Sequence, residues 1–136
     1  MNSTIVLAST SESRIELLKN AGITFESCNH LIDEAKEKEL SLKRAEEPQE
    51  IARGLAIKKA FSVTHKFENA LVIGSDQILA FNETIFSKPK SSGDLVKQIS
   101  MFEGQKHTLY SSSCVLKGDK LLWSHTSSAV MTMRHL

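Results

Sequence analysis

Short apolar runs alternate with amphipathic stretches in the first part of the chain. Residues 4–8 (TIVLA) are apolar and rich in β-branched side chains, which predicts a buried strand. Ser11 is a suitable N-cap and Gly22 a suitable C′ residue, so we expect a helix between them. The segment ITFESCN at 23–29 predicts a second strand. A strand, a polar loop and a helix in this order indicate the start of an α/β unit.

The middle of the chain joins a charged stretch to a long helical pattern. Residues 33–47 (DEAKEKELSLKRAEE) have little apolar periodicity, which is typical of a solvated loop or a surface helix. Pro48 suits the first position of a helix, and the pattern that follows predicts a helix over about 48–67.

The second half of the chain is predicted to form mainly strands. The pattern predicts a strand over 70–75 and a hairpin over 78–86 that turns at Asn82-Glu83. A helix capped by Ser91 or Ser92 is expected to run to Phe102. Strands over 107–116 and 121–133, joined at Gly118-Asp119, are expected to follow. We find no linker and no internal repeat, so residues 1–136 are expected to form one α/β domain.

Composition and charge indicate which partners the protein binds and in which cellular compartment it is found. The net charge of +1 lacks the basic excess of a nucleic-acid surface. No stretch approaches the roughly 20 apolar residues of a membrane span, and Met1–Ser9 lacks the basic start of a signal peptide. Cys28 and Cys114 match no metal or redox spacing. A cytoplasmic protein that binds neither nucleic acid nor membrane is expected.

One lysine falls on the apolar side of the predicted long helix. Ile51, Leu55 and Val63 lie on one half of the helical wheel, and Lys59 lies in the middle of that half. Such a lysine either extends its ammonium group out to solvent or meets an anion. The second interpretation makes Lys59 a candidate phosphate ligand, and the pattern leaves both open.

The loop after the first predicted strand is a candidate anion site. A helix N-terminus presents free N–H groups and the positive end of the helix dipole. Ser9, Ser11 and Arg14 lie beside it, and a guanidinium group can bind phosphate oxygens in pairs. Serines that merely cap the helix are the simpler interpretation.

Two further positions could serve a phosphate or a metal. Asp33 and Glu34 form a carboxylate pair after apolar Leu31-Ile32, and carboxylates bind Mg²⁺ or Mn²⁺ together with substrate phosphates. Lys88 precedes Pro89, which holds it extended.

The segment IGSDQIL at 73–79 places a carboxylate and an amide between apolar residues. Asp76 either caps a turn between two strands or lies at a strand end for catalysis, where ligand sites of α/β sheets gather. In the second case it could deprotonate a water molecule or hold a metal. Gln77 carries a donor and an acceptor, which suit the edge of a base.

Taken in order, these segments resemble the Maf family of nucleoside triphosphate pyrophosphatases. The matching segments are LASTSESRIELL at 7–18, DE at 33–34, KKA at 58–60, IGSDQIL at 73–79, SKP at 87–89 and GQKHTLYS at 104–111. The resemblance implies an elongated mixed sheet with flanking helices around a nucleotide cleft, similar to the inosine triphosphate pyrophosphatases. It also implies a nucleoside triphosphate substrate, a divalent metal (Mg²⁺ or Mn²⁺) and a homodimer.

The resemblance assigns roles to individual residues. It implies phosphate binding by Ser9 and Arg14 and a metal ligand at Glu34. Lys59 and Lys88 match the two conserved lysines of the family, and Asp76 matches its proton acceptor. Ser13 and Gln77 match its specificity positions. The tripeptide SDQ resembles the branch that hydrolyses 7-methyl-GTP, although that branch often has an aromatic residue where Ser13 stands.

The family pattern continues beyond the region that residues 1–136 match, into a helix and a glycine-rich segment. The alternative function is therefore a nucleotide-binding or regulatory protein, related to septum formation, that binds a nucleotide without turnover.

Overall fold

The computed structural model describes residues 4–82, 84–86 and 89–135. The helices are α1 (Glu12–Asn20), α2 (Glu34–Lys43), α3 (Pro48–Thr64) and α4 (Ser92–Phe102). The strands are β1 (Ile5–Leu7), β2 (Glu26–Ser27), β3 (Leu71–Phe81), β4 (Thr84–Phe86), β5 (Lys106–Lys117) and β6 (Lys120–Thr132). No helix in the described part of the chain is long and apolar enough to cross a membrane.

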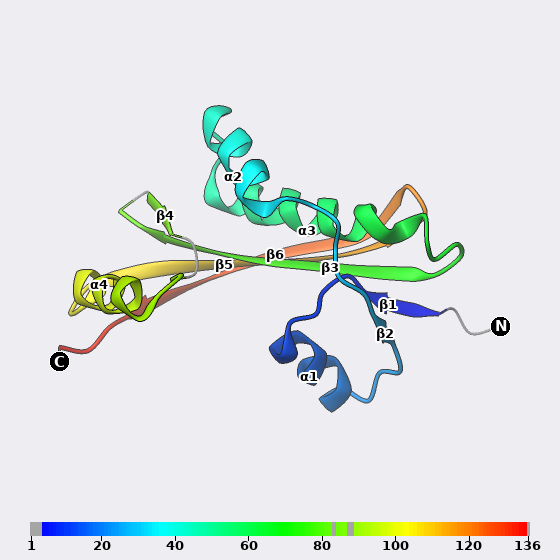
Figure 1. The fold of residues 1–136 in the computed structure, drawn as a ribbon, viewed down its shortest axis with the longest axis horizontal. Helices are drawn as coiled ribbons and strands as arrows, with labels where there is room; N and C mark the ends of the chain where they lie inside the picture. Colours follow the sequence, from blue (N-terminus) through cyan, green and yellow to red (C-terminus); the bar gives the residue numbers. More distant parts are fainter. Residues whose placement is uncertain (1–3, 83, 87–88, 136) are drawn as a thin grey trace.

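The strands form a single mixed sheet in the order β2-β1-β3-β5-β6, with β4 paired to β3. β1 is parallel to β2 and β3, whereas β3 is antiparallel to β4 and β5, and β5 is antiparallel to β6. The molecule is elongated, with α2 and α3 on one side of the sheet and α1 on the other (Figure 1). The predicted α/β class, with an elongated mixed sheet and flanking helices, is confirmed.

The core lies between α3 and the face of β3 that α3 covers. Buried and partly exposed residues alternate along β3, as expected for a strand with one covered face. Val72 belongs to one apolar cluster and Ile78 to a second, which also contains Ile51, Ala52 and Leu55 of α3. Asp76 is buried on β3 between these two clusters.

β3 corrects the prediction of a strand that ends near residue 75. It continues without a break to Phe81, so Asp76 lies within a strand, neither in a turn nor at a strand end. β5 pairs with every residue from Val72 to Ala80, and the polar segment therefore keeps its backbone partners. The predicted hairpin is confirmed in its pairing of Phe81 with Thr84, although Glu83 lies outside the described residues.

Other boundaries differ from the sequence expectation in small ways. The charged stretch contains the surface helix α2, one of the two expected possibilities. The long helix α3 ends at Thr64 instead of about residue 67, because a tight turn begins there in which Phe67 N–H donates to Thr64 O. Ser91 caps α4 by accepting from Asp94 N–H at 3.1 Å. The turn between β5 and β6 places Gly118 at a φ of 61°.

Candidate nucleotide-phosphate site

A buried ion pair lies at the centre of the candidate site. Lys59 Nζ donates to Asp76 Oδ1 at 2.8 Å. Lys59 is only 3% exposed and Asp76 only 4%. The interpretation in which Lys59 extends to solvent is therefore wrong, because its ammonium group meets a carboxylate inside the protein.

A glycine allows this pair to form. A Cβ atom at Gly74 would collide with the carbonyl oxygen of Ala56, so glycine is what lets α3 approach β3 so closely. Gly74 lies two residues before Asp76 on the same face of β3, and Ala56 lies one helical turn before Lys59. The close contact between the two backbones thus brings the two charged side chains together.

Glu34 adds a second carboxylate to Lys59. It is the first residue of α2, and its Oε1 lies 2.7 Å from Lys59 Nζ. Burial raises the pKa of the Glu34 carboxyl, but the hydrogen bond and charge of Lys59, together with smaller contributions from His30 and Lys38, outweigh burial, so the pKa lies below its ordinary value. Asp33 has a different role from its neighbour, because it caps α2 by accepting from Lys36 N–H.

Asp76 keeps one oxygen without a partner. Its Oδ2 is buried and has no hydrogen-bond partner among the described residues. An unpaired buried carboxylate oxygen is costly, so a ligand that pairs with it would be favoured. The described residues contain no group of three metal-binding side chains. Two carboxylates with substrate phosphates and water nevertheless fit the way in which Mg²⁺ is usually held.

The loop after β1 organises Ser9, Ser11 and Arg14. The buried Ser9 Oγ accepts from Ser11 N–H at 3.1 Å and from Arg14 Nη1 at 3.5 Å. Ser11 is the N-cap residue of α1 by position, but its side chain makes no capping bond. Its hydroxyl is therefore not committed to the helix. The structure brings these three residues together as the sequence predicts.

The sheet has an opening next to this loop. β1 pairs with β3 only as far as Ile73, and β4 begins to pair only at Leu79. Between these two points, the described residues place no strand along this edge of β3. Asp76 and Gln77 lie in this interval, and Ser9 lies two residues beyond the end of β1. The position beyond the end of β1 is where α/β sheets bind ligands.

Gln77 and Ser13 are both exposed, unlike the ion pair. Adjacent residues of a strand point to opposite faces, so Gln77 leaves the sheet on the face away from α3. That is the side on which α1, with Ser13 in its first turn, is found (Figure 1). Lys88, the other predicted lysine, lies outside the described residues.

Sequence reasoning missed His30 near this site. Its Nε2 lies 3.1 Å from Glu34 Oε1. The spacing of four residues is visible in the sequence, but His30 lies before α2 begins, where helical spacing predicts no contact. The sequence pattern also predicted no partner for Lys58, which in the structure forms an ion pair of 2.6 Å with Glu37 of α2.

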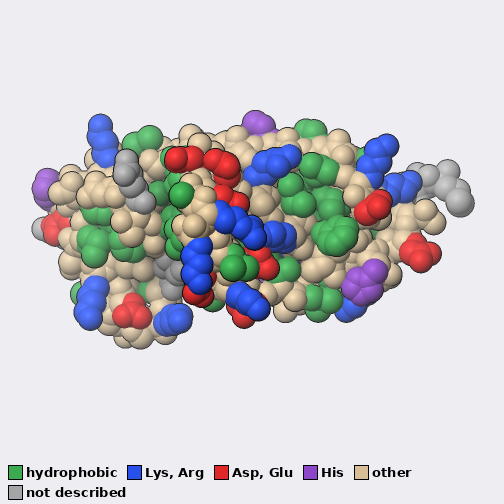
Figure 2. Space-filling view, turned by 90° about the horizontal axis from the view of Figure 1, so that it is seen from above, with side chains coloured by type: hydrophobic (Ala, Val, Ile, Leu, Met, Phe, Trp, Pro, Cys, Tyr) green, Lys and Arg blue, Asp and Glu red, His purple; other side chains and the backbone are tan. Residues whose placement is uncertain are grey.

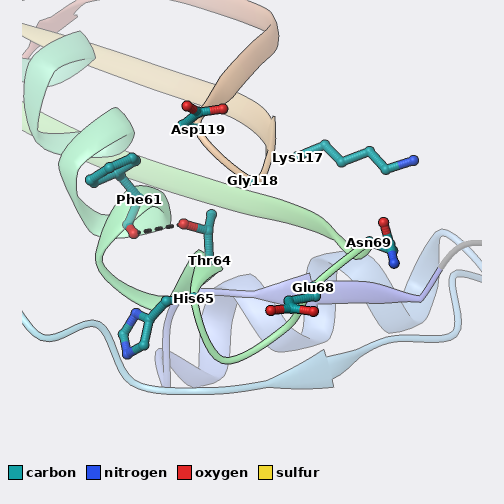
Figure 3. A pocket seen from close by; sticks show the side chains of 8 residues that line it. All are labelled: Phe61, Thr64, His65, Glu68, Asn69, Lys117, Gly118 and Asp119. Carbon is teal, nitrogen blue, oxygen red and sulfur yellow. Dashed lines mark hydrogen bonds between the residues drawn. The ribbon is translucent and has the colours of Figure 1, made fainter.

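A separate hollow of about 490 Å³ lies at the far end of α3. Its lining comes from the end of α3, the segment that follows it and the turn between β5 and β6 (Figure 3). Phe61 and His65 are exposed there, and neither Lys59 nor Asp76 reaches it. We therefore place the candidate site at the buried charges and not in this hollow.

Comparisons with known proteins place the chain in a family. The family model for Maf-like protein matches residues 4–136. A 7-methyl-GTP pyrophosphatase of Brucella suis biovar 1 (strain 1330) is 40% identical over 132 residues, covering 97% of this chain and 66% of that protein. A nucleoside triphosphate pyrophosphatase of Rhodopseudomonas palustris (strain BisB18) is 39% identical, covering 97% of this chain and 64% of that protein.

Among solved structures, a HAM1 protein from Coxiella burnetii aligns with 95% of this chain and 71% of its own, with 15% identity and a TM-score of 0.49. The chain spans about two thirds of the length of the curated relatives that it matches. The match of the family model over residues 4–136 shows that the chain belongs to the Maf-like protein family.

Proposed function

We propose that the protein is a nucleoside triphosphate pyrophosphatase, which hydrolyses the bond between the α- and β-phosphates to give a monophosphate and pyrophosphate. The observation that carries this proposal is the buried Asp76 carboxylate, whose Oδ1 is held by Lys59 and whose Oδ2 has no partner among the described residues. Relatives named as pyrophosphatases, at 39–40% identity, support it.

A divalent cation, Mg²⁺ or Mn²⁺, belongs to this proposal. Glu34 and Asp76 would hold it through carboxylate oxygens. When bound, it would offset the negative charge that the phosphates develop during the reaction. A cation near both carboxylates would offset part of their charge, and the Lys59 ammonium group, which has three N–H donors, could also donate to a phosphate oxygen while it stays paired with them.

In the proposed reaction, the oxygen of a water molecule forms a bond to the α-phosphorus. Asp76 Oδ2 accepts the proton of that water, and the bond from the α-phosphorus to the bridging oxygen breaks, so that pyrophosphate leaves. Ser9, Ser11 and Arg14 would bind phosphate oxygens at the start of α1, where backbone N–H groups also point outward. Lys88 is assigned to the same polyphosphate by family resemblance.

The proposed substrate is 7-methyl-GTP, the nucleotide named for one of the similar proteins. Gln77 and Ser13, both exposed, are the residues assigned to the base. The two cysteines are free, which suits a cytoplasmic enzyme that acts on nucleotides, and a homodimer stays a prediction of the resemblance.

Pyrophosphate release tests the activity. The chain would be assayed with 7-methyl-GTP, GTP, dTTP and UTP in the presence of Mg²⁺ or Mn²⁺, while binding of each nucleotide is measured by calorimetry. Release of pyrophosphate with a monophosphate supports the proposal. Binding without release would instead support the alternative of a regulatory protein, and release of single phosphates would exclude cleavage at the α-phosphorus.

Replacing Gln77 with Thr tests the choice of substrate. Gln77→Thr shortens the side chain and removes the amide that could pair with a purine edge, so kcat/KM for 7-methyl-GTP should fall relative to dTTP and UTP. The measurement is the ratio of the three kcat/KM values in the wild type and the variant. An unchanged ratio would mean that Gln77 does not read the base.

A further inference from the structure

Glu34 is less firmly held by packing than Asp76. Its side chain is 39% exposed and lies at the first position of α2, whereas the Asp76 side chain is 5% exposed within a paired strand. A carboxylate of this kind can rotate unless a donor fixes it. The orientation of Glu34 therefore depends on the groups that approach its oxygens.

His30 is anchored where it can fix this carboxylate. Ile32 packs against the apolar cluster of Ile51, Leu55 and Ile78, and its backbone N–H donates to His30 Nδ1 at 3.4 Å. An Nδ1 atom that accepts a hydrogen bond leaves the proton of the neutral ring on Nε2. That Nε2 atom lies 3.1 Å from Glu34 Oε1, a distance at which it can donate.

We propose that His30 is a positioning residue that orients Glu34 toward a divalent cation. His30 Nε2 and Lys59 Nζ both approach Oε1 of Glu34, at 3.1 and 2.7 Å. Two donors on Oε1 would leave Oε2 as the oxygen that Glu34 offers to the cation that it would share with Asp76. Residues that orient metal ligands in this manner typically change metal affinity about 10–100-fold when replaced. This inference rests on the proposed function.

Two variants at position 30 separate positioning from packing. His30→Leu keeps the bulk of the side chain and removes the donor, whereas His30→Gln keeps an N–H at about the reach of Nε2. Mn²⁺ affinity would be measured from the electron paramagnetic resonance signal of the free ion, which needs no turnover. We expect His30→Leu to weaken Mn²⁺ binding by about 10-fold or more, and His30→Gln to retain most of the affinity. The Mn²⁺ concentration for half-maximal activity should rise in His30→Leu while kcat at saturating Mn²⁺ is kept.

Separate results would overturn this inference and the proposed function. A wild-type protein that binds Mn²⁺ and releases pyrophosphate, with His30→Leu binding Mn²⁺ equally well, overturns only the role of His30. A wild-type protein that does neither overturns the proposed function and with it this inference. Long-range ¹H–¹⁵N NMR of the wild-type ring adds a test that needs no variant: a proton on Nε2 is expected, and a neutral ring with its proton on Nδ1 overturns the proposal.

Discussion

Lys58 and Lys59 are neighbours on α3, and both pair with a glutamate of α2, but their surroundings differ. Lys58 lies 2.6 Å from Glu37, and its side chain is 40% exposed. Lys59 lies 2.7 Å from Glu34 and 2.8 Å from Asp76, and its side chain is 4% exposed. Acidic and basic side chains are intermixed over α2 and α3 in the view of that face (Figure 2). The distances are nearly equal, so burial is what should separate the two lysines.

Burial changes what the loss of a partner costs. Water can reach Glu37 if Lys58 is removed, since the side chains of this pair are partly exposed, 40% for Lys58 and 27% for Glu37. Asp76 has no such access to solvent, so the loss of Lys59 would leave a charge unpaired inside the protein. Adjacent positions with the same residue type therefore have different consequences for stability and chemistry.

The largest expected effect is on stability, from Lys59→Met. The variant leaves Asp76 buried without its partner and should lower the free energy of unfolding by about 3–5 kcal/mol at pH 7. Urea denaturation measures the change. The matched control is the double variant Lys59→Met with Asp76→Leu, which removes both charges and should recover most of the loss. If the single variant is as stable as the wild type, burial does not raise the cost of removing Lys59.

The next largest effect is on catalysis, from Asp76→Asn. An amide can still accept from Lys59, so the fold and the nucleotide affinity should be kept, while loss of the general base should lower pyrophosphate release about 10²-fold or more. Single-turnover assays, with calorimetry to follow binding, separate the two quantities. Hydrolysis at the wild-type rate would show that Asp76 has a purely structural role.

The two members of this pair were visible in the sequence, but their contact was not. Lys59 on an apolar helical face and Asp76 between apolar residues each stand out, because a charge there needs a partner. That they pair with each other depends on the close approach at Gly74, a tertiary contact that no local pattern encodes. The length of β3 was misjudged for a related reason, since β5 supplies backbone partners across the polar segment.

The loop residues show the same limit. Ser9 and Arg14 were predicted together because a strand followed by a helix places them together. His30 escaped prediction because its contact with Glu34 is made from the irregular segment between β2 and α2. Its ring is anchored through Ile32 to residues of α3 and β3 far along the chain. Periodicity finds residues on a common helical face, but it does not find side chains fixed by distant packing.

A smaller effect concerns pH and Glu34. Its pKa in the folded protein lies below the ordinary value of 4.5, so its stabilising contribution is complete above that pH and is lost as the pH falls toward the folded pKa. The stability difference between the wild type and Glu34→Gln should therefore be larger at pH 7 than at pH 3. Denaturant titrations at several pH values measure it. The control is Glu39→Gln, whose exposed pair with Lys43 should give a difference near zero throughout. A difference for Glu34→Gln that does not change with pH would contradict the ion pair with Lys59.

The smallest effect is expected from Lys58→Met, which completes the comparison of the two lysines. It carries the same substitution as Lys59→Met one residue earlier, at an ion pair that is just as short, but water can replace the lost partner of Glu37. We expect a change of about 0–1 kcal/mol in the free energy of unfolding, which should shrink further in high salt because exposed charges are screened. Pyrophosphate release should stay at the wild-type level, since the ion pair of Lys58 is with Glu37 and involves neither Glu34 nor Asp76. If Lys58→Met instead destabilises the protein as much as Lys59→Met does, the pair with Glu37 must be what holds α2 onto α3, and burial would not be the property that separates the two lysines.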